Sequence, residues 1–91
     1  EYAITLAELK RQVREAQLKT AVSVNKELIL LYWDIGKTIA EKQEVAGWGT
    51  RVIEKLAKDL RIEFPGMQGF SRANVFYMRS FYIKTQKVQQ L

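Results

Sequence analysis

The first half of the chain has the periodicity of helix. Residues 3–45 contain no proline, and apolar residues recur there at steps of three and four, the spacing of one helical face. These residues are Leu6, Leu9, Val13 and Ala16, followed by Val24, Leu28, Leu31, Tyr32, Ile35 and Ile39. The phase slips at residues 20–23, so the pattern predicts one long bent helix or two helices that meet near Ser23-Val24-Asn25. A pattern this long also favours coiled-coil-like packing or self-association.

A glycine-rich break follows at residues 45–50, Val-Ala-Gly-Trp-Gly-Thr. Gly47 is expected to end the preceding helix in a left-handed conformation, because glycine has no Cβ to clash there. Gly49 or Thr50 is expected to cap the next helix, which runs to about Ile62. A hydrophobic staple around Gly49 would consist of Trp48 and Ile53.

The second break, residues 64–70, reads Phe-Pro-Gly-Met-Gln-Gly-Phe and holds the only proline of the chain. Ser71 is expected to cap a third helix from Arg72 to about Lys84, with Phe70 and Val75 as its staple. No segment alternates with period two, so no sheet is expected. The sequence therefore predicts one all-α domain over residues 1–91. It consists of a long N-terminal helix, bent or broken, and a helix–turn–helix-like pair of shorter helices.

The residue inventory argues against an active site in this chain. There is no cysteine and no histidine, which removes thiolate metal sites, the commonest metal ligand and the commonest general base. Glu8-Leu9-Lys10 matches the acid-x-Lys spacing of Mg²⁺-dependent nucleases, but it lies on a predicted helix, where such triplets arise by chance. We therefore predict no catalytic residue, metal ligand or cofactor here. No apolar run approaches the roughly 20 residues that span a bilayer, so no membrane contact and a cytoplasmic location are expected.

The net charge of +5 is unevenly distributed. Residues 1–63 nearly balance acids and bases, whereas residues 64–91 carry four cations and no acid. Those cations are Arg72, Arg79, Lys84 and Lys87. This asymmetry indicates either an anionic partner near the C-terminal end or a solvated basic helix.

The helix–turn–helix outline favours double-stranded DNA as that partner, because the second helix of such a unit enters the major groove. Arginine pairs with guanine and asparagine with adenine through two-point contacts. Candidate DNA-binding residues are Ser71, Arg72, Asn74 and Arg79, with Arg51, Lys55, Lys84 and Lys87 as phosphate contacts. The connection from Glu63 to Phe70 is longer than the usual three or four residues, which weakens the match.

The alternative is an oligomerisation or protein-docking module without nucleic-acid contact. On the third predicted helix, Val75, Met78 and Tyr82 share one face, while Phe76 and Ile83 lie on the other. A helix that is apolar on two faces is usually buried on two sides. Phe76 and Ile83 are therefore candidate interface residues, and the long helix would pair with its copy in a homodimer.

The chain resembles the N-terminal domain of YhcG-like proteins over nearly its whole length. The resemblance lies in residues 24–37, Val-Asn-Lys-Glu-Leu-Ile-Leu-Leu-Tyr-Trp-Asp-Ile-Gly-Lys, and in two later groups. One group is Gly47-Trp48-Gly49 with Val52-Ile53 and Leu56. The other is Phe64-Pro65-Gly66, Gly69-Phe70-Ser71, Asn74, Met78-Arg79 and Phe81-Tyr82.

In that bacterial family the domain precedes a C-terminal PD-(D/E)XK nuclease domain. The resemblance implies a DNA-binding helical module that targets an attached Mg²⁺-dependent nuclease to nucleic acid. The nuclease half is absent from this chain, which begins at Glu1 rather than methionine and is expected to be part of a longer protein. Among the motif residues, Tyr32 and Trp33 are expected to anchor the core. Gly36 suggests a close helix crossing, with Trp48 as a candidate neighbour.

Overall fold

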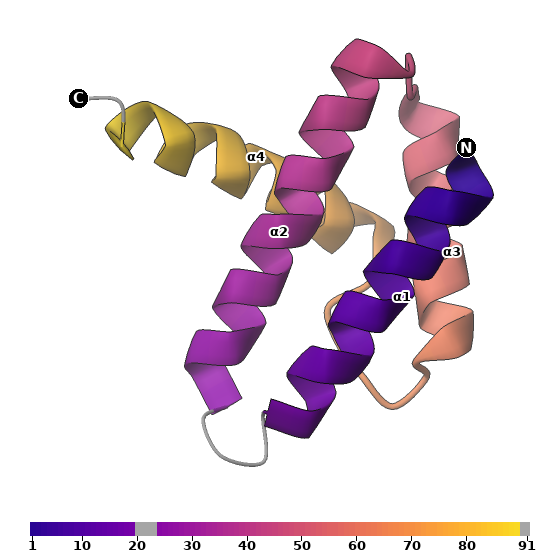
Figure 1. Cartoon of the computed structure of the whole chain (residues 1–91), viewed down its shortest axis with the longest axis vertical. Helices are drawn as coiled ribbons and strands as arrows, with labels where there is room; N and C mark the ends of the chain where they lie inside the picture. The colour runs from indigo at the N-terminus through magenta and orange to yellow at the C-terminus, as the bar shows by residue number, and fades with distance from the viewer. Residues whose placement is uncertain (20–23, 90–91) are drawn as a thin grey trace.

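The computed structural model describes residues 1–19 and 24–89, and this part of the chain contains four helices and no strand. The helices are α1 (Tyr2–Lys19), α2 (Val24–Val45), α3 (Thr50–Glu63) and α4 (Arg72–Gln89). In Figure 1, α1 and α2 run in opposite directions, α3 lies beside α1, and α4 crosses behind α2. The all-α prediction is confirmed.

The single long N-terminal helix is not observed. The helical pattern of residues 3–45 is divided between α1 and α2, which pack against each other as antiparallel neighbours (Figure 1). The alternative of two helices is the one observed, and α2 begins at Val24, within the expected junction. The phase slip at residues 20–23 lies outside the described residues. Antiparallel packing buries both apolar stripes within one chain, which a continuous helix would leave exposed.

Most of the periodic apolar residues form one core between the helices, whereas Leu6, Leu28 and Tyr32 of the predicted stripe are only partly buried. All of the following side chains are at most 7% exposed: Leu9, Val13, Ala16, Leu31, Ile35, Ile39, Trp48, Ile53, Leu56, Ala57, Leu60, Phe64, Phe70, Val75, Met78 and Tyr82. These residues include the buried side of α3, which consists of Ile53, Leu56, Ala57 and Leu60. They also include the predicted core face of α4, because residues at three- and four-residue spacing share one side of a helix.

The helices α2 and α4 cross closely at Gly36. A Cβ built on Gly36 would lie 2.1 Å from the carbonyl oxygen of Met78, so only glycine fits at this crossing. The close crossing is confirmed, but its partner is the backbone of α4 rather than Trp48. Trp48 instead packs against the ring of Tyr2, with centroids 5.7 Å apart.

The two aromatic residues of the α2 motif are partly buried and join α2 to α4 and its loop. Trp33 makes an edge contact with Tyr82 at 4.9 Å between ring centroids. Its Nε1 donates a hydrogen bond to Thr85 Oγ1 at 2.7 Å. The Tyr32 hydroxyl donates to the carbonyl oxygen of Gln68 at 3.2 Å. These bonds fix the angle at which α4 leaves the crossing.

The predicted caps at Gly47, Gly49 and Ser71 are confirmed. Gly47 has a φ of +68° and follows the end of α2. Gly49 is the N-cap of α3, and Ser71 caps α4, where its Oγ accepts a hydrogen bond from the Asn74 N–H at 3.2 Å. α4 extends to Gln89, beyond the predicted end near Lys84. Among the described residues, no helix is both long enough and apolar enough to cross a membrane.

Candidate nucleic-acid interface

The connection between α3 and α4, residues 64–71, is anchored to the core near both of its ends. Phe64 and Phe70 are buried, and their ring centroids lie 6.5 Å apart. Arg61 Nη1 donates a hydrogen bond to the carbonyl oxygen of Phe70 at 2.6 Å. The two buried rings give this loop a fixed shape despite its length, because each is anchored in the core.

Gly69 completes the positioning of the start of α4. It has a φ of +107°, and a Cβ at this position would lie 2.5 Å from the hydroxyl oxygen of Tyr32. Its carbonyl oxygen accepts a hydrogen bond from Asn74 Nδ2 at 3.2 Å. The first turn of α4 is therefore tied to the loop through Ser71 and Asn74, two of the predicted site residues. Both side chains are exposed, so they remain accessible to a ligand.

Arg72 lies at the start of α4 and contacts two neighbours. Its Nε donates to a carboxylate oxygen of Glu54 in α3, and its guanidinium lies 5.0 Å from the centre of the Phe76 ring. The Arg72 and Glu54 side chains are 59% and 41% exposed. Because an exposed ion pair contributes only about 0–1 kcal/mol, this pairing orients Arg72 without preventing exchange for another anion.

Arg79 lies deeper than the other predicted contacts. Its Nε donates to Oε1 of Gln43, and it lines a groove of about 490 Å³ between α2 and α4. Ile83 lines the same groove, together with Glu41 and Glu44 of α2. The two carboxylates lower the local positive potential around Arg79. Phe76, the other predicted interface residue, packs partly buried against the core beneath Arg72.

The remaining predicted phosphate contacts lie in two separate places. Arg51 and Lys55 are exposed on α3, where Lys55 also pairs with Asp59 at 3.0 Å. Lys84 is exposed on the second half of α4, and Lys87 belongs to the last turn of that helix. Figure 1 shows α3 and the C-terminal end of α4 on opposite sides of α2. The fold therefore does not bring all eight predicted residues together.

One exposed cation on α3 was missed in the sequence. Lys58 follows Arg51 by seven residues and Lys55 by three, so all three lie on one side of α3 and all three are exposed. That spacing was visible in the sequence. The acids of the same segment balance these cations in a count of net charge, whereas residues 64–91 contain no acid.

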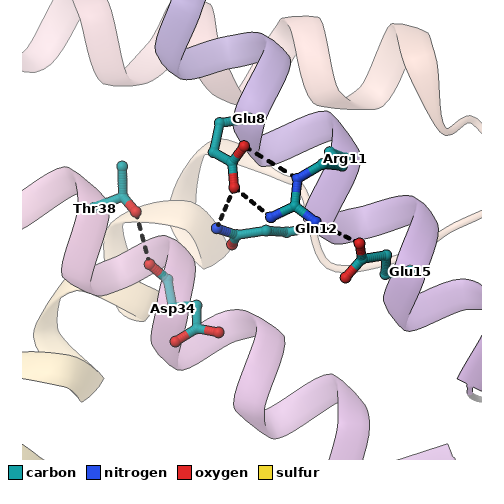
Figure 2. Close-up of polar contacts among 6 residues, drawn as sticks. All are labelled: Glu8, Arg11, Gln12, Glu15, Asp34 and Thr38. Carbon is teal, nitrogen blue, oxygen red and sulfur yellow. Dashed lines mark hydrogen bonds and ion pairs between the residues drawn. The ribbon is translucent and has the colours of Figure 1, made fainter.

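The two charged residues of the acid-x-Lys triplet belong to different ion pairs: Glu8 pairs with Arg11 within α1, whereas Lys10 pairs with Glu63 of α3 at 3.1 Å. Figure 2 shows the Glu8 carboxylate bonded to Arg11 and Gln12, with Glu15 pairing with Arg11 from the next turn. The hydrogen bond from Arg11 holds the pKa of Glu8 below its ordinary value. Within residues 1–19 and 24–89, no group of three or more His, Cys, Asp or Glu side chains is arranged to hold a metal ion.

The helices define a small all-helical domain in which an ordered loop joins the last two elements. The model of the family described as DUF1016 N-terminal domain matches residues 8–91. The chain belongs to that family, which agrees with its resemblance to the N-terminal domain of YhcG-like proteins. Neither a curated protein nor a solved structure matched this chain.

Proposed function

We propose that this domain binds double-stranded DNA through α3, the loop and the start of α4, and targets an attached PD-(D/E)XK nuclease to it. The observation that carries the proposal is the first turn of α4. Arg72 and Asn74 are exposed there on a backbone held by the core, and residues 64–91 contain no acid. The parent protein would be cytoplasmic, and Mg²⁺ would be required by the nuclease domain rather than by this one.

The start of α4 offers two kinds of contact to a duplex. The N-terminal end of a helix favours phosphate, because its free N–H groups and dipole are positive. Arg72 carries the donors that pair with a guanine edge, and Asn74 carries the amide donor and acceptor that pair with an adenine edge. Each good two-point contact contributes about 1–3 kcal/mol of discrimination. That range exceeds the 0–1 kcal/mol of an exposed ion pair, so Arg72 would exchange Glu54 for the nucleic acid.

The outer side of α3 would contact the phosphate backbone of the duplex. Arg51, Lys55 and Lys58 are exposed along it, and Glu54 ties this helix to Arg72. Contacts to phosphate position a protein on the duplex without reading its sequence. Lys84 and Lys87 lie farther along α4 and would contact phosphate only if the duplex follows that helix.

The test measures duplex binding by fluorescence anisotropy at two salt concentrations. We expect affinity to fall steeply with salt, and Arg72→Ala to weaken binding about 5- to 100-fold. Arg11→Ala is the matched control, because Arg11 is also an exposed, ion-paired helical arginine, at 54% exposure against 59% for Arg72. Salt-independent binding, or equal losses in the two variants, would refute the proposal.

The alternative, an oligomerisation or docking module without nucleic-acid contact, is favoured by one observation. Ile29, Leu30 and Tyr77 are large apolar side chains that remain 53%, 49% and 64% exposed. A domain that binds duplex only weakly at low salt, and whose affinity is unchanged by Arg72→Ala, would leave this alternative as the better description.

A further inference from the structure

The outward side of α2 carries a regular stripe of residues. Its members follow one another at steps of four and three, the spacing that keeps residues on one seam between paired helices: Lys26, Leu30, Trp33, Lys37, Ala40 and Glu44. This stripe lies opposite the buried residues Leu31, Ile35 and Ile39 of the same helix. It therefore faces away from the core of its own chain, although Trp33 and Ala40 lie partly buried beside α4.

The charges of the outward stripe are separated along the helix. Lys26 is exposed at its start, Lys37 just past its middle and Glu44 at its end, with Glu41 exposed beside Glu44. None of these four residues forms an ion pair with another residue in the described part of the chain. A stripe that begins with a lysine and ends with a glutamate complements an antiparallel copy of itself at its two ends.

In an antiparallel pair of α2 helices, the other residues of the stripe also face suitable partners. An antiparallel pair centred on Ile35 would place Leu30 of one copy opposite Ala40 of the other, and Trp33 opposite Lys37. The same register places Lys26 opposite Glu44, and every contact occurs twice. Lys37 already lies 5.8 Å from the Trp33 ring centre within one chain, so a cation over this indole is compatible with the local geometry.

A groove lies where Leu30 of a second copy would be placed. Ala40 and Glu44 line the groove of about 490 Å³ between α2 and α4, together with Tyr82 and Ile83. Leu30 is 49% exposed on its own chain, and in this groove it would contact Ala40 and Ile83, which lie among polar and charged side chains. The groove also holds Glu41 and Glu44, which would accept Lys26 of the copy.

We propose that α2 pairs with α2 of a second copy of this chain as an antiparallel two-fold dimer. Lys26, Leu30 and Trp33 of each copy meet Glu44, Ala40 and Lys37 of the other. A two-fold interface must be self-complementary, since each patch contacts itself in the partner. The outward stripe satisfies that condition in charge, in apolar contact and in register. The dimer does not depend on DNA binding, and the residues assigned to the two roles do not overlap.

The first test uses sedimentation equilibrium of the 91-residue chain over a concentration series from micromolar to millimolar. We expect a monomer–dimer equilibrium, and Leu30→Asp should abolish the dimer, because it would bury two unpaired carboxylates. Ile62→Asp is the matched control, since Ile62 is a 67% exposed helical residue on α3, away from α2. A chain that stays monomeric at every concentration, or a dimer that survives Leu30→Asp, would overturn the proposal.

The second test addresses the register. Lys26→Glu and Glu44→Lys each replace two attractive pairs by two repulsive ones. Each change should raise the dimer dissociation constant roughly 10- to 100-fold, more strongly at low salt. The double variant Lys26→Glu/Glu44→Lys restores opposite charges at both places and should recover most of the native affinity. Failure of the double variant to recover while it remains folded by circular dichroism would overturn the antiparallel register.

Discussion

The substitution Gly36→Ala tests the close crossing of α2 and α4. The added Cβ would lie 2.1 Å from the Met78 carbonyl oxygen and 2.6 Å from the carbonyl carbon. Ordinary contact begins near 3.4 Å, so α2 and α4 would have to separate locally by about 1.3 Å. Because the obstacle is backbone in the middle of a helix, no side-chain rotation relieves it.

Two opposing effects set the magnitude. Alanine is better than glycine inside a helix by about 1 kcal/mol, whereas overpacking costs typically about 1–3 kcal/mol. A clash with rigid backbone lies at the upper end of that range, so we expect a net loss of about 1–2 kcal/mol. For a domain of this size each kcal/mol lowers the melting temperature by about 4–8 °C. Separation of α2 and α4 would also disturb the hydrogen bond between Trp33 and Thr85. The tryptophan fluorescence of the folded variant should therefore differ from that of the native chain.

Two other glycines provide matched controls for thermal and urea unfolding. Nothing lies within 4 Å of a Cβ at Gly66, so Gly66→Ala should be neutral or stabilising by up to about 1 kcal/mol. Gly47 also has open space but a φ of +68°, so Gly47→Ala should cost about 1–2 kcal/mol through backbone strain alone. If Gly36→Ala is as stable as the native chain, the close crossing of α2 and α4 is wrong.

Three further predictions concern the cap, the loop and pH. Ser71→Ala should cost about 1 kcal/mol by removing the acceptor of the Asn74 N–H, and Ser71→Asn should restore most of it in urea unfolding. Phe70→Ala should cost about 3–5 kcal/mol, and a smaller loss than that of Ser71→Ala would contradict its role in holding the loop. Burial alone would raise the pKa of Asp59, but hydrogen bonds from Tyr2 and Lys55 outweigh it and lower that pKa below its ordinary 3.8. The stability that Asp59 contributes is therefore present above this ordinary value and is lost as pH falls through the lowered one. Thermal melts from neutral pH to below 3.8 should show less acid destabilisation in Tyr2→Phe than in the native chain, and equal acid losses would refute the linkage.

The candidate site was only partly predictable. The sequence identified Ser71 as the cap and Arg72 and Asn74 as exposed residues of the first helical turn, because capping acts over a few residues. No pattern in the sequence indicates that Arg72 pairs with Glu54, or that Arg79 hydrogen-bonds to Gln43 beside two carboxylates. Those partners lie 18 and 36 positions away and meet only through the packing of the helices.

The same distinction holds for the fold. Local chemistry by itself determined that the chain is helical, that Gly47 and Gly49 separate α2 from α3, and which face of each helix is apolar. Tertiary structure alone decided that α1 turns back along α2 and that Gly36 meets the backbone of Met78. Helix period and capping depend on residues three or four positions apart, whereas the folding back of α1 and the crossing depend on which apolar stripes can be buried together. A pattern of period 3.6 reveals each stripe but not the stripe against which it packs.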